Sequence, residues 1–220
     1  IDKKMTRTNT RALVTGSIPA VHALIFAALL GVAGFASILI WLNVRTALLG
    51  FIGWSVYISA YAIAKRKSSL STVVGSIAGA VPPAAGYVAV TDRFDAAALW
   101  LFLGLVFWQM PHFYALAMRR RDDYAAAGLP VLPVRRSMRT TKFHIMAYIV
   151  AFYGAVLGLY LARYTGVVYL VVMTMCCIWW FWSGLKGFNS KNDKKWTGMM
   201  FGYSLLVLCA YCLLVSVNPR

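Results

Sequence analysis

Seven long stretches without a charged residue limit how this chain can fold more than any other feature. Each stretch has 18 to 23 residues and lacks Asp, Glu, Lys and Arg, and about 20 apolar residues let a helix cross the ~30 Å hydrocarbon core of a bilayer. The stretches cover residues 21–43, 46–64, 70–90, 96–118, 145–162, 166–185 and 198–217. The chain is 61% hydrophobic and lacks strand-like alternation, so we predict an all-α, polytopic transmembrane bundle of seven helices.

The Lys and Arg residues alternate between cation-rich and cation-poor loops. The eight hydrophilic breaks hold 4, 1, 3, 1, 7, 1, 4 and 1 of the 22 cations. Short cation-rich loops stay on the cytoplasmic side of a membrane, so the chain is predicted to begin there and to end outside. A bacterial inner membrane fits best, with the mitochondrial inner membrane, facing the matrix, as the alternative. The net charge of +16 then reflects topology and contact with anionic lipid, and no nucleic-acid partner is expected.

Carboxylates are scarce, with six Asp residues and no Glu. Asp2, Asp122 and Asp123 lie in predicted cytoplasmic loops beside many cations. Carboxylates that hold Mg²⁺, combined with Lys and Arg, are typical of a site for a metal-bound diphosphate. Charge balance after three arginines explains Asp122 equally well. The chain has no glycine-rich phosphate loop, so an ordinary nucleotide-binding fold is not supported.

The text at the start of the chain resembles the first aspartate motif of the UbiA-type membrane prenyltransferases. In that family the motif reads Asn-x-x-x-Asp-x-x-x-Asp, and Asp2 matches its last carboxylate, followed by Arg7 and Arg11. Spacing of four puts such residues on one helix face, which suits a shared Mg²⁺ site. The Asn and the middle Asp would precede Ile1, and the chain does not begin with Met, so the sequence looks N-terminally truncated.

A second element of the family is similar to Tyr61-x-x-x-Lys65, at the next cytoplasmic helix end. In the family these two residues face the prenyl diphosphate. The resemblance implies that cations at the two helix ends stabilise the charge that develops as the allylic C–O bond breaks. These cations are Lys65, Arg7, Arg11 and Arg66. The family has nine helices, so the chain would be a single membrane-embedded domain over 1–220, without the first helix and most of the second.

Four further segments resemble one branch of the family, the enzymes that farnesylate heme. They are GSIAGAVPPAAGY (75–87), WQMPHFYA (108–115), RDDY (121–124) and GLPVLP (128–133). The resemblance implies transfer of the farnesyl group of farnesyl diphosphate to a vinyl group of heme b, with water completing the product, heme O. Heme b would be a substrate and Mg²⁺ the cofactor, with heme A synthase or terminal-oxidase assembly as partners.

The resemblance assigns roles residue by residue. Catalytic roles fall on Asp2, Lys65, Asp123 and His112, and Asp2 and Asp123 would hold the metal. Substrate-binding roles fall on Arg7, Arg11, Tyr61, Arg66, Asp122, Gln109 and Tyr114. We expect His112 to be a heme-iron ligand or a proton-handling group, although such a His on its own is more often a hydrogen-bonded structural residue.

Three other features carry expectations about structure. Pro82-Pro83 predicts a break in a membrane helix, and such a break points to a lined cavity. The loop at 186–197 is predicted to be a solvated topological loop. Four of the seven cations of the longest loop either clamp phosphate or serve topology and lipid contact. These four are Arg135, Arg136, Arg139 and Lys142.

Two alternatives stay open. Another UbiA-type prenyltransferase, acting on a quinone precursor or a chlorin, would share Asp2 and the Tyr61-x-x-x-Lys65 pair. An assay with heme b against 4-hydroxybenzoate separates it from the heme-specific reading. A non-enzymatic seven-helix transporter or receptor would use the cations for topology alone. The mid-membrane charges usual in ion-coupled carriers are absent from the apolar stretches.

Overall fold

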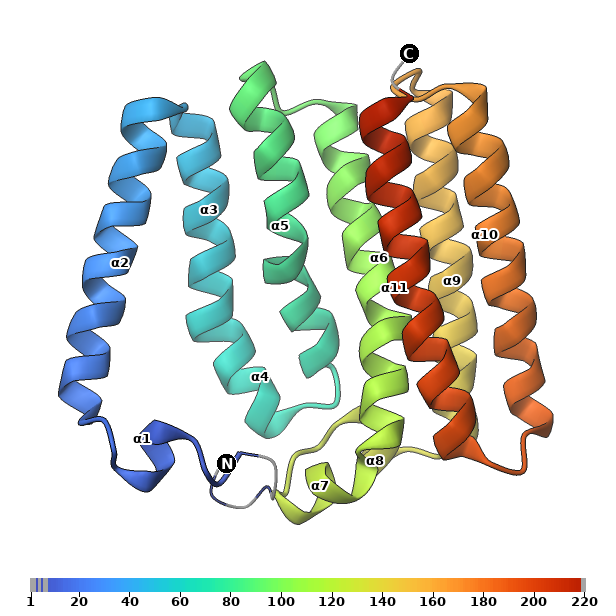
Figure 1. Ribbon diagram of the computed structural model, residues 1–220, viewed down its shortest axis with the longest axis horizontal. Helices are drawn as coiled ribbons and strands as arrows, with labels where there is room; N and C mark the ends of the chain where they lie inside the picture. Colours follow the sequence, from blue (N-terminus) through green and yellow to red (C-terminus); the bar gives the residue numbers. More distant parts are fainter. Residues whose placement is uncertain (1–2, 4, 6–7, 219–220) are drawn as a thin grey trace.

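Seven long helices stand side by side in the computed structural model, which describes residues 3, 5 and 8–218 (Figure 1). All seven are long and apolar enough to cross a membrane. They are α2 (Ala20–Trp41), α3 (Val44–Val56) continued by η2 (Tyr57–Tyr61) and α4 (Ala62–Lys67), α5 (Ser71–Thr91), α6 (Ala96–Arg119), α9 (Met138–Leu161), α10 (Val167–Leu185) and α11 (Asp193–Val217). The predicted all-α bundle of seven spanning helices is confirmed.

Two helices start five or more residues earlier than the charge-free stretches predict. The α9 helix begins at Met138 rather than at 145, and the Ser137 hydroxyl caps it by accepting a hydrogen bond of 3.0 Å from the Thr140 N–H. The α11 helix begins at Asp193, where the Asn192 side chain accepts from the Lys195 N–H at 2.9 Å. A helix continues past the hydrocarbon region until a cap satisfies its first N–H groups, so its start follows the cap and not the last charge.

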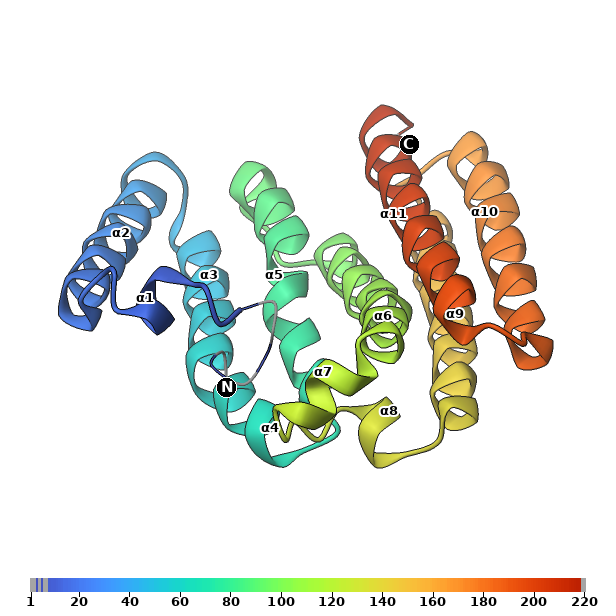
Figure 2. The ribbon, with the colours of Figure 1, turned by 60° about the horizontal axis from the view of Figure 1, so that its bottom comes forward.

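The cation-rich loops lie at one end of the bundle. Three short helices occupy this end, namely α1 (Ala12–Thr15), α7 (Arg121–Ala126) and α8 (Leu132–Arg135), and the 3₁₀ turn Lys186–Asn189 joins α10 to α11 there. Figure 2 shows α1, α4, α7 and α8 gathered around this end of α3, α5 and α6. The sequence pattern predicted that these loops share one side, and in the structure they lie at the same end of the bundle.

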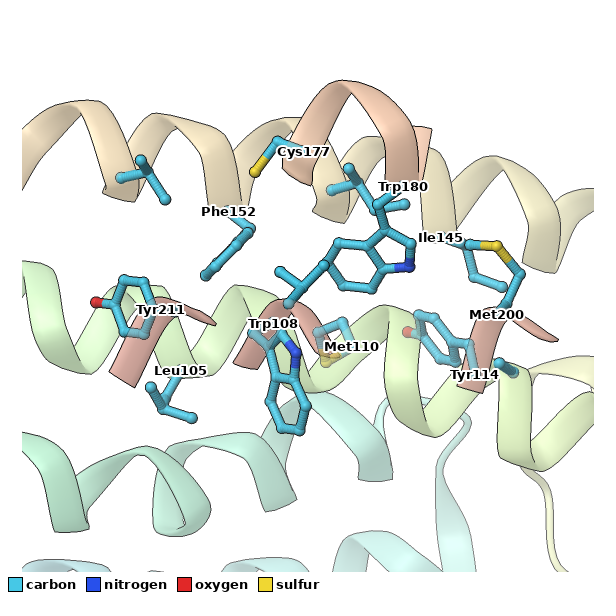
Figure 3. Packing of buried hydrophobic residues seen from close by; sticks show 14 of the residues in the cluster. Leu105, Trp108, Met110, Tyr114, Ile145, Phe152, Cys177, Trp180, Met200 and Tyr211 are labelled. Atoms are coloured by element: carbon cyan, nitrogen blue, oxygen red, sulfur yellow. The ribbon is translucent and has the colours of Figure 1, made fainter. Parts of the chain in front are cut away.

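The core lies where α6 packs against α5, α9 and α11. Phe152 of α9 makes edge contacts with Trp180 of α10 and Tyr211 of α11, at ring-centroid distances of 6.1 and 5.5 Å (Figure 3). Lipid is as apolar as these side chains, so dispersion and close approach at small residues hold membrane helices together. Gly104 illustrates this, because an added Cβ would lie 2.7 Å from the Tyr211 hydroxyl oxygen.

The predicted helix break at Pro82-Pro83 is wrong, because α5 continues as one helix from Ser71 to Thr91. Each proline removes one N–H group, and the carbonyls deprived of that donor belong to Ala78 and Gly79, four residues earlier. Both residues line a cavity that can admit a polar partner. A helix keeps its course through proline where such neighbours satisfy the freed carbonyls.

Candidate active site

A cavity of about 600 Å³ opens among the segment before α1, α3 with η2 and α4, α5, α6, and α7 with the loop that follows it. Its volume is in the range of ligand-binding pockets. At the cation-rich end of the bundle its lining includes Thr8, Arg11, Lys65 and Tyr124. Its interior lining is largely aromatic and small, with Trp54, Tyr57, Gly75, Gly79 and Phe113. One end therefore suits an anion and the remainder suits an apolar chain.

Tyr61 and Lys65 lie together at the charged end, as the i, i+4 spacing predicts. The Lys65 Nζ atom is 5.9 Å from the centroid of the Tyr61 ring. The attraction between an ammonium and a ring face keeps this cation at the cavity wall. Arg11 reaches the same cavity from the loop before α1. Of the predicted site residues, Arg11, Tyr61, Lys65 and Gln109 are brought together here.

A π-helical turn, η2 (Tyr57–Tyr61), interrupts this spanning helix beside the cavity. It stacks the Tyr57 and Tyr61 rings, whose centroids are 5.5 Å apart. Single π-turns inside α-helices occur frequently at functional sites. An added Cβ at Gly75 would lie 2.9 Å from the Tyr61 ring, so α5 needs glycine there. The sequence prediction missed Tyr57, although its position four residues before Tyr61 on the same helix was an available signal.

Gln109 lies deeper in the cavity and is only 6% exposed. Its Nε2 atom donates to the Leu105 carbonyl oxygen at 3.0 Å and to the Ser76 carbonyl oxygen at 3.2 Å. Two carbonyl partners can accept only from the NH₂ group, so the orientation of the amide is fixed. An added Cβ at Gly79 would collide with the Gln109 Oε1 atom. The amide oxygen therefore occupies space that only glycine leaves open.

His112 and Tyr114 are not among the described residues that line this cavity. The His112 ring lies between Trp108 and Phe201, at centroid distances of 5.0 and 4.4 Å. Its Nδ1 atom is 2.8 Å from the Ser204 Oγ atom of α11. Tyr114 is buried and packs against α9. These two residues therefore lie on the α9 and α11 sides of α6 rather than with Lys65.

The carboxylates near the charged end lie on α7. The Asp123 side chain is one-third exposed and its Oδ2 atom is 3.7 Å from Arg120. Asp122 is exposed, whereas Tyr124, the next residue after Asp123, lines the cavity. Arg66 is exposed and is not among the described lining residues. The predicted residues Asp2 and Arg7 lie outside the described residues.

The carboxylates fit a metal that is shared with a substrate, not a metal held by protein alone. Among the described residues, no three His, Cys, Asp or Glu side chains come together as a metal site. Mg²⁺ is usually bound by one or two carboxylates and completed by substrate phosphates and water. The loose ion pair of Asp123 with Arg120 leaves carboxylate oxygens available for that purpose. The partly exposed Asp123 carboxylate is compatible with Mg²⁺ that a bound substrate completes, although neither Asp122 nor Asp123 is among the described residues that line the cavity.

Lys142 has a structural partner, which corrects the prediction that the loop at 186–197 is merely solvated. The Lys142 Nζ atom donates to the Asp193 carboxylate at 2.6 Å and to the Gly187 carbonyl oxygen at 2.8 Å. The Lys142 side chain is 8% exposed, and its Nζ atom lies 5.3 Å from the centroid of the buried Trp196 ring. This loop is therefore fastened to α9 by a buried cation.

Comparison with known proteins places the chain in a family. The family model described as the UbiA prenyltransferase family matches residues 1–215. The chain belongs to the UbiA prenyltransferase family. It is an enzyme that spans the membrane several times, and the transporter alternative is rejected.

Three curated relatives of this UbiA prenyltransferase carry the same name. The chain is 43% identical over 219 residues to the protoheme IX farnesyltransferase of Citrobacter koseri, covering 99% of the chain and 74% of that protein. It is 43% identical over 220 residues to the protoheme IX farnesyltransferase of Sodalis glossinidius, with the same shares covered. The Yersinia pseudotuberculosis (serotype O:1b) protein of that name is 42% identical over 219 residues.

A solved structure from work on digeranylgeranylglyceryl phosphate synthase in membranes has the same fold as this UbiA prenyltransferase. The TM-score is 0.80, and the match covers 99% of this chain and 75% of the other. The identity between the two sequences is 16%, so this likeness supports the fold alone.

Proposed function

We propose that this UbiA prenyltransferase transfers the farnesyl group of farnesyl diphosphate to a vinyl group of heme b, which yields heme O. One observation carries the proposal: a single cavity has cations at one end and an aromatic, glycine-lined interior at the other. A prenyl diphosphate has the same division between an anionic head and an apolar tail. The 43% identity to named protoheme IX farnesyltransferases supports heme b as the acceptor.

The diphosphate head binds at the charged end, against Lys65 and Arg11. As the allylic C–O bond breaks, negative charge accumulates on the departing diphosphate. A fixed cation beside a developing charge lowers the barrier, and removing one such contact typically reduces the rate by about 10²–10³. Tyr61 holds the Lys65 ammonium near its ring, which lowers the entropy lost when the cation engages phosphate.

Asp123, with Asp2 from the first aspartate motif, would hold Mg²⁺ at this end. When bound, Mg²⁺ would offset the negative charge of the diphosphate. Asp122 and Arg66 would interact with the same head group from the periphery, and Arg7 would add a further cation. In this arrangement the protein supplies carboxylates and cations, and no nucleophilic side chain is required.

The farnesyl tail occupies the interior of the cavity, against Trp54, Tyr57 and Phe113. These side chains present apolar faces to the isoprenoid chain. We assign the binding of heme b, the acceptor, to α6. Gln109 of this helix faces the cavity, and His112 follows it by three residues, about one helical turn. Tyr114 would support this side from the α9 interface. The active end is proposed to face the cytoplasm, or the matrix of a mitochondrion.

A UbiA prenyltransferase that acts on a quinone precursor or a chlorin would share the cations and Tyr61. The acceptor that the enzyme uses therefore distinguishes this alternative from a heme farnesyltransferase. The test incubates the enzyme in membranes with farnesyl diphosphate, Mg²⁺ and either heme b or 4-hydroxybenzoate. We expect farnesylated product from heme b alone. Product from 4-hydroxybenzoate alone would assign the enzyme to the quinone branch.

A further inference from the structure

The amide oxygen of Gln109 is presented to the cavity as a hydrogen-bond acceptor. Its NH₂ group is engaged by two backbone carbonyls, those of Leu105 and Ser76. No hydrogen bond among the described residues reaches Oε1, and this atom is not among the fully buried polar atoms that lack a partner, so it is accessible from the cavity that Gln109 lines. Within a side chain that is otherwise buried, such an atom can be hydrogen-bonded only by water or a ligand in the cavity.

A second acceptor lies beside Gln109. Pro83 has no N–H group, so the Gly79 carbonyl lacks its usual helical donor. Gly79 lines the same cavity and contacts the Gln109 amide. Two neighbouring acceptors suit a water molecule that donates both of its hydrogens, because a buried water typically makes about three hydrogen bonds.

The position of this pair along α5 matches the reacting end of the substrate. Gly75 packs against Tyr61, whose ring neighbours the Lys65 ammonium. Gly79 is one turn deeper, roughly 6 Å at a rise of 1.5 Å per residue. The acceptor pair therefore lies just inside the proposed diphosphate site, where the first carbons of a prenyl chain would be.

We propose that Gln109 and the Gly79 carbonyl hold the water that completes the reaction, an inference that rests on the proposed function. When the C–O bond of farnesyl diphosphate breaks, its electron pair leaves with the diphosphate. The terminal vinyl carbon of heme b forms a C–C bond to the farnesyl carbon, which leaves a carbocation on the vinyl carbon attached to the macrocycle. The water oxygen then bonds to that carbon, and one of its protons passes to diphosphate or bulk water.

The geometry favours this outcome because a water that donates both hydrogens directs its lone pairs away from Gln109 and Gly79, toward the cation. Without a held water, the same cation loses a proton from the adjacent carbon and forms an alkene. That product is lighter than the hydroxylated one by one water. Gln109 is thus a water-positioning residue, and it controls the ratio of two products rather than the rate of ionisation.

The test measures the ratio of hydroxylated to dehydrated farnesyl-heme by liquid chromatography and mass spectrometry. Gln109→Met keeps the length of the side chain and removes the acceptor. Gly79→Ala adds a Cβ that collides with Oε1 and displaces the amide. Gly86→Ala is the matched control on the same helix, since its Cβ would meet nothing within 4 Å. Reactions in ¹⁸O-labelled water identify the oxygen that enters the product.

We expect both active-site variants to shift the ratio toward the dehydrated product by roughly tenfold, the effect of about one lost hydrogen bond. Gly86→Ala should keep the parent ratio. If Gln109→Met makes too little product to measure, Gly79→Ala decides. If the ratio of hydroxylated to dehydrated product in Gln109→Met, or in Gly79→Ala when that variant is used instead, equals that of the parent, the role of Gln109 is overturned. This holds even if total product falls. Absence of farnesylated heme from the parent enzyme would instead overturn the proposed function.

Discussion

The Nδ1 atom of His112 lies 2.8 Å from the Oγ atom of Ser204, and the Ser204 hydroxyl is also 2.6 Å from the Phe201 carbonyl oxygen. A hydroxyl has one hydrogen, and a carbonyl can only accept. Ser204 therefore donates to Phe201 and accepts from His112. The imidazole is held with its proton on Nδ1, which leaves the lone pair on Nε2 for a metal or a proton.

This arrangement predicts that His112→Ala impairs heme use more than diphosphate binding. Ser204→Ala should act in the same direction and weaken heme binding by about 10-fold, because partners that orient a ligand typically contribute 10–100-fold to affinity. Heme titration by absorbance and diphosphate binding by calorimetry separate the two substrates. Unchanged heme affinity and turnover in His112→Ala would favour the purely structural role that its packing against Trp108 also permits.

Lys65→Ala should lower the rate of heme O formation by about 10²–10³ while the protein stays in the membrane, because a cation beside the departing diphosphate is lost. Lys67→Ala is the matched control, since Lys67 is on the same short helix, exposed and absent from the described cavity lining. Initial rates at saturating farnesyl diphosphate give the comparison. A Lys65→Ala enzyme as active as its parent would remove this residue from the site.

Asp123→Asn should raise the Mg²⁺ concentration needed for half-maximal activity and nearly abolish turnover at low Mg²⁺. An amide binds Mg²⁺ through one neutral oxygen and loses the carboxylate charge. Asp92→Asn is the control, because Asp92 pairs with Arg45 at 2.6 Å at the other end of the bundle. Identical Mg²⁺ titrations for Asp123→Asn and the parent would show that the metal is held elsewhere.

The Lys142–Asp193 pair predicts a loss of stability without a loss of chemistry. Lys142→Ala leaves the Asp193 carboxylate and the Gly187 carbonyl without their donor, and we expect the free energy of unfolding to fall by about 3 kcal/mol. Thermal unfolding in detergent measures the change, and the rate per folded molecule should stay near the parental value. A normal unfolding temperature with weakened diphosphate binding would instead support the alternative that Lys142 clamps phosphate.

Topology can be tested with single cysteines in a background without the four native ones. Ser137→Cys lies in the cation-rich end, and Arg45→Cys lies at the opposite end. An impermeant thiol reagent added to intact cells should label the Arg45 variant and spare the Ser137 variant. Labelling of Ser137→Cys from outside would contradict both the charge argument and the proposed cytoplasmic position of the active end.

The helices were predictable because lipid allows few alternatives, and a charge-free stretch of about 20 residues leaves only a spanning helix. Helix starts were less predictable, since caps such as Ser137 and Asn192 lie outside those stretches. The unbroken α5 shows a second limit. The sequence shows that a pair of prolines lacks two N–H groups. Whether the helix breaks or continues there depends on neighbours that are distant in sequence.

The site was partly predictable for a similar reason. Tyr61 and Lys65 are four residues apart on one helix, so their proximity follows from local geometry. Gln109 meets Gly79 across a helix interface, and no local pattern reports that contact. His112 and Tyr114 belong to the same motif as Gln109 but point to other faces of α6, because successive residues on a helix are turned by about 100°. The motif therefore predicted which segment of α6 contributes to the site more reliably than it predicted which face of the helix each residue occupies.

The mass of the product formed from heme b and farnesyl diphosphate distinguishes the proposed reaction from prenylation of another acceptor. The enzyme is assayed with Mg²⁺ in membranes from cells that make no heme O of their own, beside the Lys65→Ala variant. We expect the parent to convert heme b into a species heavier by one farnesyl group and one hydroxyl group, and the variant to form it at about 10²–10³ times lower rate. Heme b recovered unchanged, with the farnesyl group transferred to an aromatic acceptor instead, would show that heme b is not the acceptor.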